Sequence, residues 1–160
     1  MTKKNLLFYG AVAVIIFSGQ FLLNRDMVTG RPPALAEVTI DGEPVANRIA
    51  QGPGIIYFWA QWCGLCAMMQ DPVSEVLKEY PGVTVALKSG KEGAVKRYLG
   101  EHGLDWPVVN DAEGTIGERY GVHGVPAVFV LNSEGDILFT SVGYSTEIGL
   151  RIRLWLAGFF

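Results

Sequence analysis

The residues of this 160-residue chain with the most distinctive chemistry are its two cysteines, Cys63 and Cys66. Two thiols at this spacing can close one disulfide, and exchange with another disulfide then passes through a mixed disulfide on one sulfur. A purely structural bridge is the alternative. Closing so small a loop removes little entropy from the unfolded chain, so the spacing favours redox work over structural reinforcement.

The cysteines lie where a predicted strand ends and a predicted helix begins. Residues 55–59 form an apolar, β-branched and aromatic run, which is typical of a strand buried on both faces. Residues 67–80 are compatible with a helix, so Cys63 should be exposed at or just before its N-terminus, where free N–H groups and the helix dipole favour a thiolate. We therefore expect Cys63 to attack and Cys66, one turn inside, to be the buried resolving thiol.

The elements that would position this pair alternate between strands and helices. After the cysteines we expect a kinked helix, because Pro72 removes one hydrogen bond and clashes with the preceding turn. A small hairpin over residues 37–45 should precede the core strand. The other predicted strands are 83–87, 106–109, 127–131 and 136–142, and the other predicted helices are 91–102, 115–120 and an amphipathic 146–157. This order predicts an α/β fold with a central mixed sheet flanked by helices.

Two motifs resemble those of a known family. They are Phe58-Trp59-Ala60-x-Trp62-Cys63-Gly64-x-Cys66 and, well downstream, Tyr120-Gly121-Val122-His123-Gly124-Val125-Pro126. Together they resemble the thioredoxin superfamily, and within it the membrane-anchored, TlpA-like disulfide oxidoreductases of the bacterial cell envelope. A narrower similarity to the suppressor-of-copper-sensitivity protein D (ScsD) type rests on Ser89-Gly90, residues 108–111 and residues 143–157.

The resemblance implies a thioredoxin-like fold and a protein-disulfide oxidoreductase, and no cofactor is expected. It also implies that Pro126 is a cis-proline facing the cysteines, which would leave the Val125 backbone free to pair with an extended substrate segment. The substrates would be thiols or disulfides of other proteins, and a membrane thiol-reductase would be the electron donor. The residues expected to bind substrate are Trp62, Gly64, Leu65, Val125 and Pro126.

Departures from the thioredoxin pattern leave the direction of electron flow open. Tyr57 occupies the position where thioredoxins carry a buried Asp, so the usual proton acceptor for Cys66 is missing from its place. Leu65 replaces the proline of the thioredoxin Cys-Gly-Pro-Cys. The candidates for a substitute acid are Asp71, Glu75 and Glu43. On balance we expect a reductase, or a donor that supports an isomerase, rather than a primary oxidant.

An apolar stretch near the N-terminus predicts attachment to the bacterial inner membrane. Residues 6–23 would reach roughly 27 Å as a helix, close to a hydrocarbon core of about 30 Å, and Lys3 and Lys4 ahead of them should stay cytoplasmic. We expect a cytoplasmic tail (1–5), a single transmembrane anchor (6–23), a spacer (24–36) and a thioredoxin-like domain in the periplasm (37–160). A signal peptide cleaved after Ala34-Leu35-Ala36 is the alternative.

Composition narrows the remaining possibilities. The formal net charge is −3, and no basic surface for nucleic acid is evident. An ordinary four-ligand zinc site would have to use both cysteines and both histidines of the chain, and no metal site is expected. The alternative function is a copper-binding module, because thiolates and thioethers suit Cu(I). Its ligands would be Cys63 and Cys66 with Met68, Met69 or His123, although methionine is also a common core residue.

Overall fold

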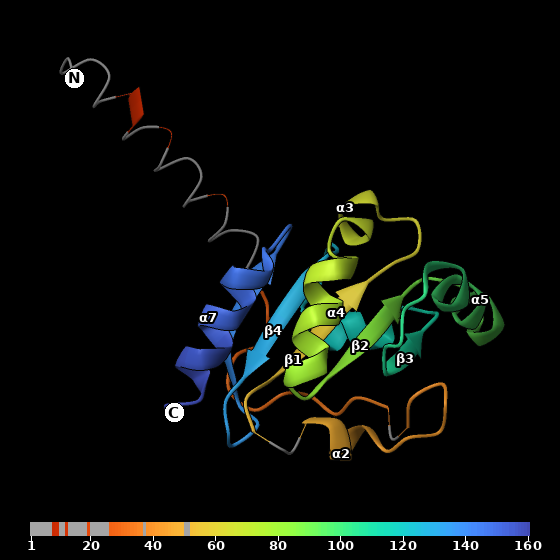
Figure 1. Ribbon diagram of the computed structural model, residues 1–160, viewed down its shortest axis with the longest axis horizontal. Helices are drawn as coiled ribbons and strands as arrows, with labels where there is room; N and C mark the ends of the chain where they lie inside the picture. The colour runs from red at the N-terminus through yellow and green to blue at the C-terminus, as the bar shows by residue number, and fades with distance from the viewer. Residues whose placement is uncertain (1–7, 10–11, 13–18, 20–25, 37, 50–51) are drawn as a thin grey trace.

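The computed structural model describes residues 8–9, 12, 19, 26–36, 38–49 and 52–160, which fold around a five-stranded sheet of order β3-β2-β1-β4-β5 (Figure 1). The strands are β1 (Gly54–Trp59), β2 (Gly82–Leu87), β3 (Val108–Asp111), β4 (Ala127–Leu131) and β5 (Ile137–Val142). β1, β2 and β3 run parallel, whereas β4 is antiparallel to both of its neighbours. The predicted mixed sheet is therefore confirmed.

β1 is buried on both faces, as predicted, and its side chains alternate between two apolar clusters. Tyr57 and Trp59 belong to the cluster covered by α4 (Gln70–Glu79), α5 (Glu92–His102) and α7 (Glu147–Ala157). Ile56 and Phe58 belong to the cluster covered by α2 (Val45–Ile49), α6 (Thr115–Arg119) and the chain around Met27. Packing on both faces holds the carboxyl end of β1 in place, and the short helix α3 (Gly64–Ala67) follows it.

The segment after the cysteines forms two separate helices, and the prediction of one kinked helix is wrong. α3 ends at Ala67 and α4 begins at Gln70, so the break falls at Met68 and Met69. Pro72 then lies in the first turn of α4, where backbone N–H groups have no intrahelical acceptor. Because Pro72 has no N–H to donate to the Met68 carbonyl four residues earlier, the helix is interrupted there by a full break and not by a kink.

The hairpin predicted over residues 37–45 is reduced to one antiparallel bridge between Val38 and Pro44, and α2 starts at Val45. Pro44 has no N–H for a strand ladder and is favourable beside a helix start, so strand pairing stops there. For a related reason β3 begins at Val108, directly after Pro107, and not at residue 106.

Residues 26–36, the described part of the predicted spacer, pack on the domain. Met27 is buried in the apolar cluster that α2 and α6 cover. Gly30 and Ile137 exchange two backbone hydrogen bonds of 3.0 and 2.7 Å, and the Tyr120 hydroxyl donates to the Pro33 carbonyl at 2.7 Å. These residues therefore belong to the folded unit, because they cover apolar surface that would otherwise face water.

The predicted anchor, residues 6–23, falls largely outside the described residues. Its described members, Phe8, Tyr9, Val12 and Gly19, are helical. Within the described part of the chain, no helix has both the length and the apolar character needed to cross a bilayer.

Candidate active site

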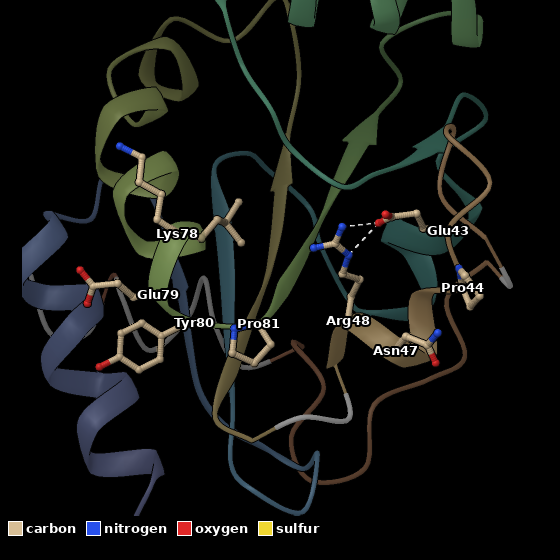
Figure 2. Close-up of a pocket in the computed structure, with 9 residues that line it drawn as sticks. Glu43, Pro44, Asn47, Arg48, Lys78, Glu79, Tyr80 and Pro81 are labelled. Carbon is tan, nitrogen blue, oxygen red and sulfur yellow. Dashed lines mark hydrogen bonds and ion pairs between the residues drawn. The ribbon is translucent and has the colours of Figure 1, made fainter.

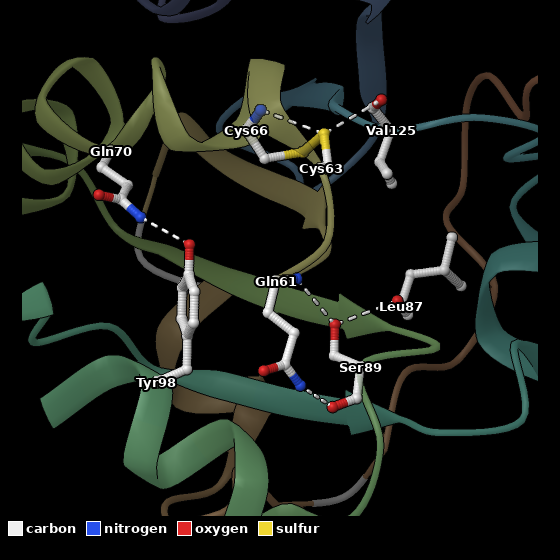
Figure 3. Close-up of a disulfide and its surroundings, with 8 residues drawn as sticks. All are labelled: Gln61, Cys63, Cys66, Gln70, Leu87, Ser89, Tyr98 and Val125. Atoms are coloured by element: carbon white, nitrogen blue, oxygen red, sulfur yellow. Dashed lines mark hydrogen bonds between the residues drawn. A yellow bond between two sulfur atoms is a disulfide. The ribbon is translucent and has the colours of Figure 1, made fainter. Parts of the chain in front are cut away.

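Cys63 and Cys66 are joined by a disulfide, with their Cα atoms 5.2 Å apart. Cys63 is the N-cap of α3, and its Sγ accepts a hydrogen bond from the N–H of Cys66 at 3.1 Å (Figure 3). Cys63 is 8% exposed and Cys66 is 3% exposed, so Cys63 is the more accessible of the two but less open than the sequence predicts. After reduction, the helix start and this N–H donor would both favour negative charge on the Cys63 sulfur.

The loop before β4 faces the disulfide. The Val125–Pro126 peptide bond is cis, and the Sγ of Cys63 lies 3.5 Å from the carbonyl oxygen of Val125 (Figure 3). Among the described residues, no hydrogen bond uses the N–H of Val125. The expected juxtaposition of the proline loop and the cysteines is therefore present, with a backbone donor left for a further strand.

The turn after β2 fastens the active-site loop. The N–H of Gln61 donates to the Ser89 hydroxyl at 3.2 Å, the Gln61 side chain donates to the Ser89 carbonyl, and the Ser89 hydroxyl donates to the Leu87 carbonyl (Figure 3). Beside it, the indole of Trp62 donates to the carbonyl of Lys88 at 3.1 Å. Lys88 has a φ of +46°, which a residue other than glycine rarely adopts. These hydrogen bonds were not predicted from the sequence, although Ser89-Gly90 is among the residues that carry the family resemblance.

The surface around the disulfide is apolar. Trp62 is 64% exposed, and Leu65 and Met68 are also exposed beside the cysteines. Tyr144, which sequence reasoning missed as a site residue, is exposed on the same end of the sheet, because the N–H of the preceding Gly143 donates to the Pro126 carbonyl at 2.8 Å. Pairing of β4 with β5 accounts for this placement.

The predicted substrate-binding residues thus gather at one end of the sheet. Trp62, Gly64 and Leu65 come from the β1–α3 connection and the start of α3, and Val125 and Pro126 come from the facing loop. A Cβ added to Gly64 would meet no heavy atom within 4 Å, so this part of the surface is open.

Trp59 packs beneath the active-site loop. It is fully buried, its indole donates to the Thr84 hydroxyl at 3.1 Å, and its ring stacks on Tyr98 with the centroids 5.4 Å apart. Trp59 therefore supports the loop, while Trp62 is available to a partner.

Tyr57 does not replace the missing buried acid. Its hydroxyl is buried and has no hydrogen-bond partner among the described residues, and its ring lies edge-on to Trp106 at 5.8 Å. Burial raises the pKa of Tyr57 well above its ordinary value, with a smaller contribution from Tyr98. The phenol therefore stays protonated at neutral pH and cannot accept a proton from Cys66.

The three carboxylates considered as substitutes lie on the surface, and no hydrogen bond or ion pair of the described residues joins them to either cysteine. Glu43 pairs with Arg48 (Figure 2), Glu75 pairs with Lys78 at 2.6 Å, and Asp71 is exposed in the first turn of α4. The prediction that one of them replaces the buried Asp finds no support in these contacts.

Two surface grooves lie away from the disulfide, and neither is lined by Cys63 or Cys66. A surface groove of about 580 Å³ lies at the opposite end of the strands, between α2 and the end of α4, and its lining includes Arg48, Tyr80 and Pro81 (Figure 2). At the end of the sheet that carries the cysteines, the apolar side chains of Trp62, Leu65 and Met68 are exposed, which suits contact with another protein.

The described residues contain no group of three or more His, Cys, Asp or Glu side chains arranged to hold a metal ion. The two candidate thioethers have different environments: Met68 is exposed, and Met69 is fully buried in the core. His123 is exposed, and its Nε2 lies 3.7 Å from the carboxylate Oδ2 of Asp26.

A cysteine pair at a helix start that follows the central strand of a mixed sheet and faces a cis-proline defines a class of protein, the thioredoxin-like thiol–disulfide oxidoreductases. The comparison with protein families agrees. The chain belongs to the Redoxin family, which matches residues 27–150.

Individual relatives support the same class. The thioredoxin-like protein of Haemophilus influenzae is 37% identical over 109 residues, which are 68% of this chain and 65% of that protein. The thiol-disulfide oxidoreductase ResA of Bacillus thuringiensis is 27% identical over 161 residues, which cover 92% of this chain and 93% of ResA. A solved structure of a secreted Mycobacterium tuberculosis disulfide oxidoreductase has a TM-score of 0.64 at 25% identity and covers 76% of this chain and 95% of that one.

Proposed function

We propose that this protein is a membrane-tethered, periplasmic thiol–disulfide oxidoreductase that reduces other proteins through Cys63 and Cys66. One observation carries the proposal: the sulfur at the N-terminus of α3 also lies 3.5 Å from the Val125 carbonyl. A substrate segment paired with the Val125 backbone would bring its disulfide to Cys63 first.

The two sulfurs then have different tasks. In the dithiol form, the Cys63 thiolate attacks one sulfur of the substrate disulfide, a Cys63–substrate bond forms, and the other substrate sulfur leaves as a thiolate. The Cys66 thiolate then attacks the Cys63 sulfur and releases the second substrate thiolate. Two electrons pass to the substrate, and the Cys63–Cys66 disulfide of the structure is the product. A membrane thiol-reductase would return the protein to the dithiol form.

The side chains around the disulfide define the kind of substrate. Trp62, Leu65, Met68 and Tyr144 are exposed and apolar, and the indole of Trp62 is held in place by the Lys88 carbonyl. An extended protein segment with apolar side chains next to its cysteine would bury this surface and pair with Val125. A role in copper tolerance, which the ScsD-like features suggest, would determine which proteins this protein reduces.

The tether is proposed from the apolar residues 6–23 and the lysines that precede them. The packing of residues 26–36 supports retention of this segment against cleavage after Ala36, because that cleavage would remove the buried Met27 and the pairing of Gly30 with Ile137. N-terminal sequencing of the mature protein from the membrane fraction tests this: a chain that begins at Glu37 and is free in the periplasm would contradict the tether.

The reduction potential against glutathione tests the direction of electron flow. A reductase should have a potential near the roughly −270 mV of thioredoxin, and a value near about −120 mV would indicate an oxidant. Titration of the reduced protein with Cu(I) tests the alternative of a copper-binding module. Stoichiometric, tight copper binding without exchange activity would favour that module and contradict our proposal.

A further inference from the structure

α7 carries apolar side chains on its exposed side as well as on the side that packs on the sheet. Its inner side packs into the core through Leu150, Leu154 and Ala157. Its outer side is exposed and carries Ile148, Ile152 and Trp155, followed by Phe159 just beyond the helix; we name these four residues the outer stripe. Their spacing of four, three and four residues places them on one face.

The outer stripe is largely exposed within the described part of the chain. Ile148 is 71% exposed and Trp155 is 61% exposed, and the rings of Trp155 and Phe159 contact each other with their centroids 4.8 Å apart. Figure 1 shows α7 at the periphery of the molecule. Four large apolar side chains gathered on one exposed face favour a contact outside the described part of the chain.

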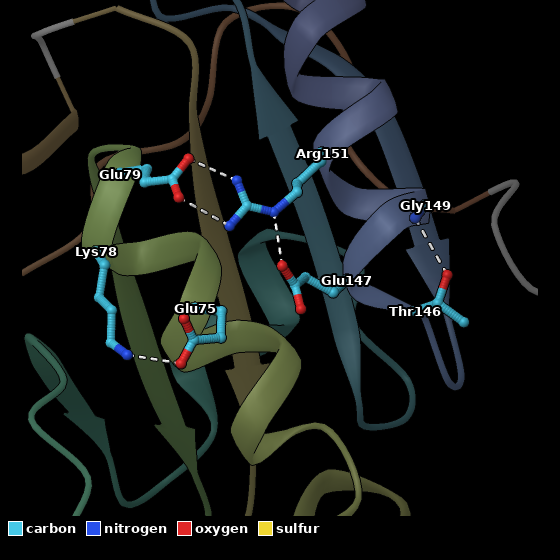
Figure 4. Close-up of polar contacts among 7 residues, drawn as sticks. All are labelled: Glu75, Lys78, Glu79, Thr146, Glu147, Gly149 and Arg151. Atoms are coloured by element: carbon cyan, nitrogen blue, oxygen red, sulfur yellow. Dashed lines mark hydrogen bonds and ion pairs between the residues drawn. The ribbon is translucent and has the colours of Figure 1, made fainter.

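The charges beside the outer stripe indicate what that contact is. From Ile148 to the last residue the sequence contains Arg151 and Arg153 and no acidic residue. Arg151 forms ion pairs with Glu79 on α4 and with Glu147 (Figure 4), whereas Arg153 has no ion pair among the described residues and donates one hydrogen bond to the Ser145 hydroxyl, at 3.5 Å. Exposed tryptophan, phenylalanine and isoleucine side chains suit the interfacial layer of a bilayer, where an arginine beside them can meet anionic lipid headgroups.

The size of the outer stripe favours a bilayer over a second copy of the chain. It extends roughly 16 Å along a helix about 10 Å wide. Its four side chains are also far fewer than the roughly 20–30 residues that each partner contributes to a stable protein complex. Insertion of a single apolar ridge by about 5–10 Å into the interfacial layer needs no larger surface.

The path of the chain supports the same contact. A Cβ on Gly121 would lie 1.9 Å from the Asp26 carbonyl oxygen, so the segment that enters the domain is packed against the loop leading to Pro126. The neighbouring segment, from Gly143, hydrogen-bonds to Pro126 and leads into α7 through its N-cap Thr146. The start of α7 therefore lies at the same end of the domain as the point where the proposed tether arrives.

We propose that the outer stripe of α7 lies in the interfacial layer of the bilayer that holds the tether. The end of the domain that carries Cys63 and Cys66 then lies beside the membrane surface. This inference rests on the proposed tether. It deepens the proposed function, because it favours partners whose cysteines are held close to the membrane surface.

Tryptophan fluorescence of the full chain in vesicles tests this orientation. The vesicles contain phosphatidylethanolamine and phosphatidylglycerol with brominated acyl chains, which quench tryptophans within reach of the bilayer. We expect Trp155→Phe to remove roughly half or more of the quenching, and Trp62→Phe, the matched exposed control, to change it little. Unchanged quenching in Trp155→Phe, or its loss in Trp62→Phe instead, would overturn the inference.

Two further measurements separate this inference from its alternatives. Ile152→Cys in a Cys63→Ser/Cys66→Ser chain is treated with a bismaleimide. Efficient homodimer formation would show that a second copy covers the stripe and would overturn the inference.

A carbonate wash tests the tether alone. If the wild-type chain resists the wash and Trp155 is not quenched, the inference fails while the tether stands; if the chain is washed off but Trp155 was quenched beforehand, the tether fails and the stripe still binds lipid.

Discussion

The sulfur of Cys63 lies 3.5 Å from the carbonyl oxygen of Val125, a residue 62 positions further along the chain. This contact joins the start of α3 to the loop before β4. It places the outer cysteine, and not Cys66, beside the backbone that a substrate strand would use. The order of attack proposed above depends on this asymmetry.

Replacement of Cys66 should therefore trap substrates. In Cys66→Ser the Cys63 thiolate can still attack, but no resolving thiolate releases the product, so mixed disulfides with protein partners should accumulate. Non-reducing gel electrophoresis of protein from cells detects them. Cys63→Ser is the matched control and should trap little; trapping by that variant alone would reverse the two roles.

Tyr57→Phe should stabilise the protein without changing its chemistry. The substitution removes a buried hydroxyl that has no partner among the described residues, so the free energy of unfolding should rise by about 1 kcal/mol. Denaturant unfolding measures this, and the exchange rate as a function of pH should stay unchanged. The control is Trp59→Phe, which removes the bond to Thr84 and should lower stability by about 1 kcal/mol. Slower exchange in Tyr57→Phe would show that the hydroxyl takes part.

Gly121→Ala should detach the segment around Asp26 from the domain. Gly121 has a φ of +68°, and an added Cβ would lie 1.9 Å from the Asp26 carbonyl oxygen. The strained backbone alone should lower stability by about 1–3 kcal/mol, and proteolysis before residue 36 should become faster. Gly124→Ala is the matched control, because nothing lies within 4 Å of its added Cβ. Equal proteolysis of both variants would contradict the packing of residues 26–36.

The ion pair between α4 and α7 should contribute a small, pH-dependent stabilisation. Arg151 donates to both carboxylate oxygens of Glu79, at 2.6 and 3.0 Å, and its hydrogen bonds and charge lower the pKa of Glu79 (Figure 4). Because the folded-state pKa is lowered, the stabilisation is present above the unfolded-state pKa and is lost as pH falls through the folded-state value.

Thermal unfolding of Glu79→Gln at two pH values tests this. The variant should melt slightly below the wild type at pH 7, and the difference should shrink below about pH 4 and in high salt. Glu75→Gln, which breaks the exposed pair with Lys78 inside α4, is the control and should change little. A difference that persists at low pH would show that the Glu79–Arg151 pair is not its cause.

Local sequence patterns were sufficient for the parts of the fold in which neighbours in sequence are also neighbours in space. The unbroken apolar run at residues 55–59 predicts a strand buried on both faces, and β1 is such a strand. The position of Cys63 at a helix start follows from the same stretch. Pro72 predicts an interruption of the helix, but the local sequence does not decide between a kink and the full break before Gln70 that the structure shows.

The sequence by itself determined the central strand, the cysteine pair at its end and, through family motifs, the proline that faces the pair. Only the tertiary structure decided the proximity of Tyr144 to Pro126, the hydrogen bonds between Gln61 and Ser89, and the packing of Met27 in the apolar cluster covered by α2 and α6. Each of these contacts joins segments far apart in the chain. Their formation depends on strand pairing and on competition among apolar side chains for a shared buried surface, and neither is encoded in a local period of residues.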